Sequence, residues 1–261
     1  MLIQRLATAA VGIPVIVLVI WVGGVLLAGV VAVAVVIASI ELSTARGMQS
    51  APMSLLAAAV TAVLPLSALA GQEYVLGAAV GALVLLSTGY TMRPDPREEI
   101  EGWLWGVSTA VYLGALASYF VLLRREHDGR DWLFFTVITV WVTDTGAYFV
   151  GRMIGKHKLA PHISPAKTIE GGFGSLAAGF ICVFVLNEAL GLNLAVQNEI
   201  ALGLLMPPVI MVGDLAESAL KRSLQIKDSS GLVPGHGGIA DRLDSLLFAA
   251  PLVYYYLRWV A

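Results

Sequence analysis

Cysteine and histidine are scarce in this chain, and their scarcity excludes several kinds of chemistry. The 261 residues include one cysteine and four histidines. A single cysteine cannot form an internal disulfide, and Cys182, inside an apolar run, is expected to pack as a small hydrophobic side chain. Clusters with zinc-ligand spacing are absent from the sequence, and no Cys-His or Ser-His-Asp arrangement for covalent catalysis is evident.

Charge is scarce as well, at 13% of residues with a formal net charge of −2. Such a balance carries no signal for nucleic-acid binding, and no Walker A sequence for phosphate binding occurs. Apolar residues are abundant instead: 58% of the residues are hydrophobic, and the mean hydropathy is +0.82. This composition is typical of an integral membrane protein.

The apolar residues gather in runs that approach the length of a membrane-spanning helix, about 20 residues. They predict an all-α, polytopic integral membrane protein with about nine transmembrane helices, the first being a membrane helix and not a secretory signal. The expected spans are 5–22, 25–42, 53–70, 74–90, 103–123, 132–150, 172–190, 200–211 and 243–260. The eighth is short, and Pro207 and Pro208 predict a kink or break in it.

The basic residues predict which way the chain crosses the membrane. Of the 16 lysines and arginines, all but four lie on the same side as the loops 151–171 and 214–245. The positive-inside rule therefore places these loops, and an active site built from them, at the cytoplasmic face. The four exceptions are Arg124, Arg125, Arg130 and Arg258.

Charge also divides the chain into two functional parts. Residues 1–123 hold few charges within their spans, with Glu41 as an exception, and we interpret them as a scaffold, a dimer contact or a lipid-facing wall. Residues 124–261 contain both polar loops and are expected to form the catalytic transmembrane region, because charge beside a bilayer is costly and marks function.

The first polar cluster of the catalytic region centres on Asp144, which lies in an otherwise apolar helix. A carboxylate there needs either a metal ion or a local lysine or arginine, and the two alternatives are equally good. The second cluster covers residues 155–174, where lysines including Lys167 can neutralise phosphate charge. Ser164 and Thr168 precede a helix N-terminus, a ready anion site, although a basic loop that touches anionic lipid headgroups is the alternative.

The third cluster begins at Asp214 and holds most of the remaining polar residues. Asp214 and Ser218 are four residues apart and share a face if the segment is helical. Asp241 and Asp244 are three apart and would share a face at the start of the last helix.

A glycine-rich turn lies between these carboxylates in the sequence. Gly237 and Gly238 allow backbone N–H groups to approach an anion closely. Arg242 is interpreted as a phosphate ligand or a partner of another carboxylate, whereas His236 either contacts phosphate or holds the loop. Carboxylates, cations and exposed N–H groups together match the needs of phosphoryl or nucleotidyl transfer, and oxygen ligands favour Mg²⁺.

The order of these residues resembles the phosphatidate cytidylyltransferases, or CDP-diacylglycerol synthases. The long family motif is similar to S-x-x-K-R-x4-K-D-x-[small]-x3-P-x-H-G-G-x-x-D-R-x-D. Here it comprises Ser218, Lys221, Arg222, Lys227, Asp228, Ser230, Pro234, His236, Gly237, Gly238, Asp241, Arg242 and Asp244. The sequence departs from the motif in a minor way at Val233, where the family usually has a larger side chain. The blocks GDLAES and SPAKTIEGGFG, and Asp144 with Tyr148 and Gly151, also match the family style.

The resemblance implies transfer of CMP from CTP to phosphatidate, giving CDP-diacylglycerol and pyrophosphate, by a homodimer in the inner membrane. It implies Mg²⁺ held by Asp214 and Asp241, with Asp144 and Asp244 as further ligands. Phosphate-binding or positioning roles are expected for Ser164, Lys167, Thr168, Ser218, Lys221, Arg222, Lys227, His236, Gly237, Gly238 and Arg242. Asp214, Asp241, Ser218 and Lys221 are expected to act directly in catalysis.

Two other classes of function compete with this one. A related CTP-dependent membrane enzyme acting on another lipid, such as a CDP-archaeol synthase or a polyprenol kinase, would share the architecture and the nucleotide chemistry. A transporter would also place charge near the membrane, but no convincing repeat relates the two halves and the charges lie in loops.

Overall fold

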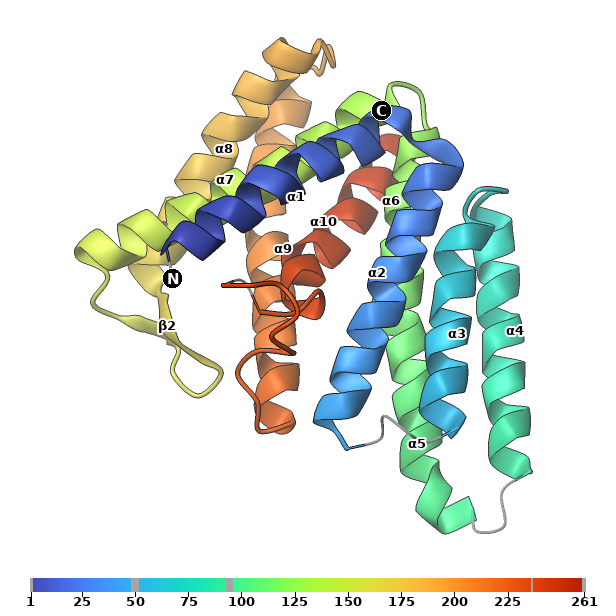
Figure 1. The fold of residues 1–261 in the computed structure, drawn as a ribbon. Coiled ribbons are helices and arrows are strands. Elements are labelled where there is room, and N and C mark those ends of the chain that lie inside the picture. The colour runs from blue at the N-terminus through green and yellow to red at the C-terminus, as the bar shows by residue number, and fades with distance from the viewer. Residues whose placement is uncertain (1, 48–51, 93–95, 236, 260–261) are drawn as a thin grey trace. The chain divides into compact units, whose positions relative to one another are not determined.

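The computed structural model describes residues 2–47, 52–92, 96–235 and 237–259, which are helical over most of their length (Figure 1). They form two compact units: a first unit of Met1–Glu126 with Asp228–Leu243, and a second unit of His127–Lys227 with Asp244–Ala261. In chain order the elements are α1 (Leu2–Val22), α2 (Gly24–Ala45), α3 (Pro52–Ser67), α4 (Gln72–Thr91), α5 (Pro96–Thr109), the π-helical segment η1 (Ala110–Ala115), α6 (Leu116–Arg125), α7 (Gly129–Ile154), β1 (Lys158–Ala160), β2 (Ser164–Thr168), α8 (Ile169–Leu190), α9 (Val196–Ser223) and α10 (Ala240–Trp259).

The expected spans are helical over most of their length, so the prediction of an all-α membrane protein is confirmed. Among the described residues, six helices are long and apolar enough to cross a membrane: α2, α4, the continuous stretch Ile100–Arg125, α7, α8 and α9. Two apolar helices are shorter, Thr8–Val22 and Ser54–Ser67. The count of nine spans therefore stays a prediction.

The eighth expected span is longer than predicted. Helix α9 runs for 28 residues and continues through Pro207 and Pro208. Tertiary packing explains why it does: Pro207 is buried, and a Cβ on Gly179 of α8 would lie 2.6 Å from its ring. The glycine makes room for the proline ring, and this close packing outweighs the backbone hydrogen bond that the proline loses.

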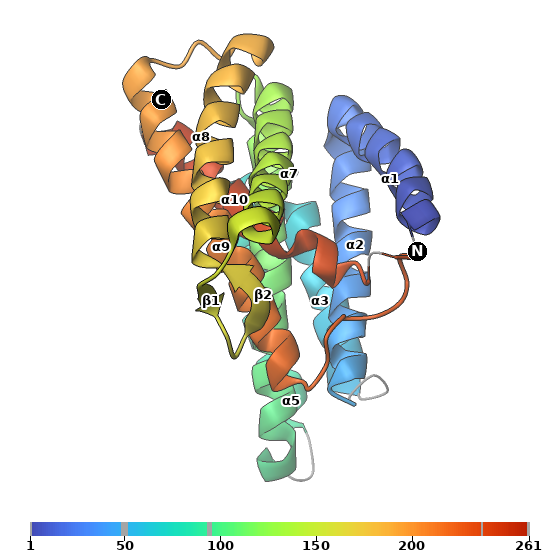
Figure 2. The same cartoon turned by 90° about the vertical axis from the view of Figure 1, so that its left-hand side faces the viewer.

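Small residues bring α7 and α8 together in the second unit, where the two helices run side by side (Figure 2). A Cβ on Gly146 would lie 2.8 Å from the carbonyl oxygen of Gly174, and a Cβ on Gly174 would lie 2.5 Å from Val150 Cβ. Close backbone approach of this kind is the usual way for helices to associate in lipid.

The core of the first unit lies where α2, α3, α4 and η1 pack together. Leu42, Leu64, Leu86 and Leu113, one from each of these elements, are almost fully buried. A Cβ on Gly114 of η1 would lie 2.9 Å from the carbonyl oxygen of Thr61, so α3 and η1 are in close backbone contact.

Arg124 and Arg125 at the end of α6, two of the exceptions to the predicted charge asymmetry, have a structural role. Arg124 donates hydrogen bonds to the carbonyl oxygens of Ile20 and Trp21, at 3.0 and 3.2 Å. Arg125 donates to the carbonyl oxygens of Ala68, at 2.9 Å, and Leu69. These carbonyls end α1 and follow α3, where helical partners are missing, so the two arginines cap helix C-termini.

Candidate functional site

A β-hairpin supplies the first part of the candidate site, in the second unit. Strands β1 and β2 pair antiparallel within the loop 151–171, an element that the sequence analysis did not predict. At its end, the buried Thr168 accepts a hydrogen bond from the Gly171 N–H at 3.1 Å and so caps α8. A Cβ on Gly155 would lie 2.6 Å from Thr168 Oγ1, so glycine there lets the end of α7 approach this cap.

Glu170 ties the start of the hairpin to the first turn of α8. Its carboxylate accepts hydrogen bonds from the backbone N–H groups of Lys156 and His157, at 3.0 and 3.2 Å. The Nδ1 atom of His157 lies 2.6 Å from the same side chain. The hairpin therefore leaves α7 and enters α8 at fixed points, which holds β2 in place.

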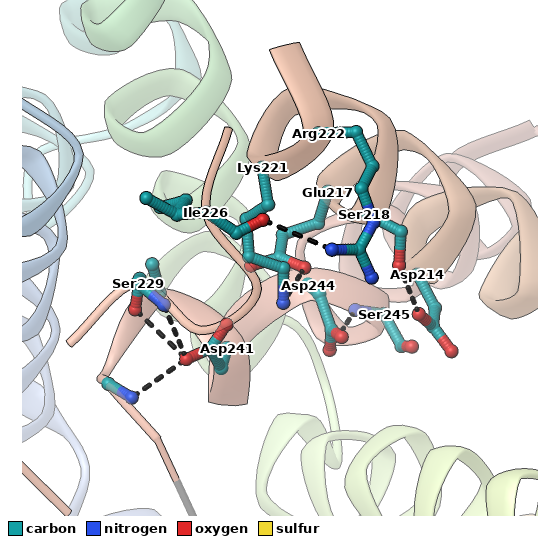
Figure 3. Close-up of polar contacts among 12 residues, drawn as sticks. Asp214, Glu217, Ser218, Lys221, Arg222, Ile226, Ser229, Asp241, Asp244 and Ser245 are labelled. Carbon is teal, nitrogen blue, oxygen red and sulfur yellow. Dashed lines mark hydrogen bonds and ion pairs between the residues drawn. The ribbon is translucent and has the colours of Figure 1, made fainter. Parts of the chain in front are cut away.

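Strand β2 and helix α9 bring together three of the predicted site residues. Lys167 Nζ lies 2.5 Å from Asp214 Oδ2, and the Ser218 hydroxyl donates to Asp214 Oδ1 at 3.3 Å. The predicted common face of Asp214 and Ser218 is confirmed, because α9 extends through both residues. Figure 3 shows the Ser218 hydroxyl directed at the Asp214 carboxylate.

The end of α9 carries two more predicted cations. Lys221 Nζ lies 2.6 Å from Glu217 Oε2, and the Glu217 side chain is only 2% exposed. Arg222 donates from Nε to the Ile163 carbonyl oxygen at 3.2 Å and from Nη1 to the Ile226 carbonyl oxygen at 3.3 Å. The bond to Ile163 links the turn of the hairpin to α9, so the predicted meeting of the loop 151–171 with the segment after residue 214 is observed at these contacts.

The other two predicted metal ligands of the second unit lie on different helices. Asp144 is in α7 and is exposed. Asp244 accepts a hydrogen bond from the Ser245 N–H at 2.6 Å. A Cβ on Gly213 would lie 2.9 Å from the Asp244 carbonyl oxygen, so Asp244 lies against the part of α9 that carries Asp214.

The remaining motif segment, Asp228–Leu243, belongs to the first unit. Its centre is Asp241, 6% exposed, whose Oδ2 accepts hydrogen bonds from the N–H groups of Ser229, at 3.0 Å, and Gly238, at 2.8 Å, and lies 3.0 Å from the Ser229 hydroxyl oxygen (Figure 3). Gly237 has a φ of +83°, which favours glycine, and a Cβ there would meet Asp241 Oδ2. Asp241 thus links Ser229 to Gly238.

Glu41 of α2 is the functional candidate that sequence reasoning missed. Its buried carboxylate accepts four hydrogen bonds from the segment 229–240, which is separated from it by 188 to 199 residues. The donors are the hydroxyls of Ser229 and Ser230 and the N–H groups of Ile239 and Ala240, at 2.6 to 3.1 Å. A charge within an apolar helix was the available signal, and interpreting it as scaffold overlooked the cost of burying it without partners.

The other predicted substrate ligands have fewer contacts. Ser164 begins β2 and is half-buried, Lys227 and Arg242 are exposed, and His236 lies outside the described residues. Their predicted roles in phosphate binding stay predictions.

The chemistry of the donors suits a hard cation. Asp214 and Ser218 present carboxylate and hydroxyl oxygens, which Mg²⁺ prefers, and the Lys167 ammonium beside Asp214 shows that the site stabilises positive charge. Across the described ranges, no group of three or more His, Cys, Asp or Glu side chains is close enough to hold a metal ion. Mg²⁺ and its ligand set stay predictions.

Comparison with known proteins agrees with the motif. The chain is 40% identical over 149 residues to the phosphatidate cytidylyltransferase of Bacillus subtilis, a match that covers 57% of this chain and 55% of that protein. It is 37% and 38% identical over 172 residues to the proteins of the same name from Staphylococcus epidermidis and Staphylococcus haemolyticus, covering 66% of this chain and 65% of each. The matched region thus spans less than two thirds of each relative. The model of the cytidylyltransferase family matches residues 3–260, and the chain therefore belongs to this family.

Proposed function

We propose that this protein transfers CMP from CTP to phosphatidate, forming CDP-diacylglycerol and pyrophosphate. The observation that carries the proposal is the ion pair of Lys167 with Asp214, a carboxylate that also accepts a hydrogen bond from Ser218, because it joins two separate motif blocks through β2 and α9. The relatives are phosphatidate cytidylyltransferases, and their names support the same substrates.

In the proposed reaction an oxygen of the phosphatidate phosphate attacks the α-phosphorus of CTP. A P–O bond forms to the lipid phosphate while the bond to the β-phosphate oxygen breaks, and the electron pair leaves with pyrophosphate. Such a transfer needs positioning and charge stabilisation and no covalent intermediate on the protein. Lys167, Lys221 and Arg222 supply cations in the second unit, where Lys167 and Arg222 bring β2 and the hairpin turn against α9.

Asp214 would hold Mg²⁺, with Ser218 positioning the metal or a phosphate beside it. The family resemblance adds three further candidate ligands of Mg²⁺: Asp241, Asp144 and Asp244. When bound, the ion neutralises phosphate oxygens and acts as a Lewis acid. Lys167, fixed on β2 and 2.5 Å from Asp214, would orient the phosphates from the hairpin side.

We also propose that the site faces the cytoplasm of a bacterial inner membrane and that the enzyme is a homodimer. The excess of lysine and arginine beside the polar loops supports this orientation, and the bacterial relatives support the membrane. CTP would then arrive from the cytoplasm while phosphatidate enters from the leaflet. The dimer rests on the resemblance alone.

The test is turnover by the purified protein in detergent, without any gradient. Labelled CTP is offered with phosphatidate, an archaeal ether-lipid phosphate or a polyprenol, and the products measured are the CDP-lipid with pyrophosphate and, for a kinase, the polyprenyl phosphate with CDP. We expect product only with phosphatidate. Product formed only with another acceptor would reassign the substrate, and no CTP-dependent turnover with any of them would favour transport.

A further inference from the structure

Glu41 is a buried charge that the proposed reaction leaves without a role. It lies in the last two turns of α2 and is 7% exposed. A carboxylate at such a place is stable only when its oxygens are satisfied by hydrogen bonds or ion pairs. The partners that satisfy it come from the glycine-rich motif segment.

Each Glu41 oxygen accepts one serine hydroxyl and one backbone N–H. Oε1 lies 2.6 Å from Ser230 Oγ and 3.1 Å from the Ile239 nitrogen. Oε2 lies 3.0 Å from both Ser229 Oγ and the Ala240 nitrogen. Since Ala240 begins α10, Glu41 provides the acceptors that the first N–H groups of a helix lack, and its negative charge suits this helix end.

The packing around Glu41 leaves little freedom for the turn. A Cβ on Gly238 would meet Ser229 Oγ and lie 2.5 Å from Glu41 Oε2. The Ser229 hydroxyl lies 3.0 Å from oxygens of both Glu41 and Asp241. The two carboxylates therefore hold the same segment from both sides, one from α2 and one from the first turn of α10.

We propose that Glu41 is a positioning residue for CMP transfer, fixing the turn with Gly237 and Gly238 and the adjoining start of α10 with Arg242 so that they can bind the phosphates of CTP. The proposal rests on the proposed function, because it assigns that turn to the nucleotide. It assigns a role in nucleotide binding to α2, which the sequence analysis interpreted as scaffold.

The test compares Glu41→Gln with Glu101→Gln in the purified full-length protein. Glutamine keeps the size of the side chain but replaces one acceptor by an amide that faces hydrogen-bond donors. Glu101 is a matched control, since it is a glutamate of the same unit that also has a partner, Arg46, but its side chain is exposed. We expect Glu41→Gln to lower kcat/KM for CTP about 100-fold and to raise KM for CTP, with KM for phosphatidate and the control unchanged.

Hydrogen exchange of the peptides that cover residues 229–240 provides a readout independent of turnover. We expect their exchange to accelerate at least about tenfold in Glu41→Gln and to stay unchanged in Glu101→Gln. If Glu41→Gln does not fold, Ser230→Ala, which removes the 2.6 Å contact, should cause a smaller change in the same direction.

Two results would overturn the positioning role: a fall in kcat with both KM values unchanged, which indicates a purely structural role, or unchanged exchange and turnover. A wild-type protein that releases no pyrophosphate with CTP and phosphatidate would instead refute the proposed function. In that event faster exchange in Glu41→Gln would still support the conclusion that Glu41 fixes the turn, and unchanged exchange would refute that conclusion.

Discussion

Replacing Asp214 by asparagine should separate catalysis from stability more cleanly than any other single change. The substitution keeps the shape of the side chain and removes its charge. The Lys167 and Asp214 side chains are 21% and 31% exposed, but the Lys167 Nζ atom itself is buried. Loss of the pair should therefore cost between the about 1 kcal/mol of an exposed pair and the about 3 kcal/mol of a buried one, which for a chain of this length corresponds to a shift in Tm of about 2–12 °C.

Turnover should respond far more strongly. Loss of a charged group that stabilises phosphate or metal charge in the transition state costs about 10³-fold in kcat, or about 4 kcal/mol. The assay is pyrophosphate release from CTP and phosphatidate in detergent, alongside a thermal melt of the same sample. A rate within about threefold of wild type would remove Asp214 from the reaction. A fall in Tm well beyond the expected range would show that Asp214 acts mainly in folding.

Three further predictions concern the second unit, the glycine-rich turn and the metal. Lys221→Met removes the ammonium next to the buried Glu217 and should destabilise the protein by about 3 kcal/mol; adding Glu217→Gln should restore Tm but not turnover, and a double variant as unstable as the single one would contradict this. Gly238→Ala should lower activity at least about tenfold because its Cβ would meet Ser229 and Glu41, whereas Gly231→Ala, where no atom lies within 4 Å, should behave as wild type. Equal activity of the two variants would show that the turn tolerates the added methyl group. EDTA should abolish pyrophosphate release and Mg²⁺ should restore it; turnover that persists in EDTA would refute the cofactor prediction.

Local patterns in the sequence were enough to predict the helices and part of the site. Apolar runs of nearly bilayer length indicate membrane helices whatever they pack against, because the backbone must satisfy its own hydrogen bonds in lipid. The spacing of Asp214 and Ser218 predicted their common face for a similar reason, since four residues make about one helical turn. The motif order also indicated the family, which the match over residues 3–260 confirms.

Other features depend on neighbours that are distant in the sequence. Pro207 is accommodated in α9 because Gly179 of α8 leaves space for its ring, and no local rule predicts that space. The hairpin is short and polar, and distant partners hold it: Glu170 of α8 binds its start and Arg222 of α9 binds its turn. Arg124 similarly acquires its partners from the end of α1, 103 and 104 residues earlier.

The sequence by itself determined that this is an apolar, helical chain with a cytidylyltransferase motif, because those properties depend only on composition, spacing and residue order. Only the tertiary structure decided which side chains hold that motif. The segment with Gly238 and Asp241 packs with the N-terminal helices, and the two Glu41 oxygens accept four hydrogen bonds from it, although α2 was predicted to be scaffold. A buried carboxylate must find its donors wherever the fold brings them, and a linear pattern cannot specify partners almost 200 residues away.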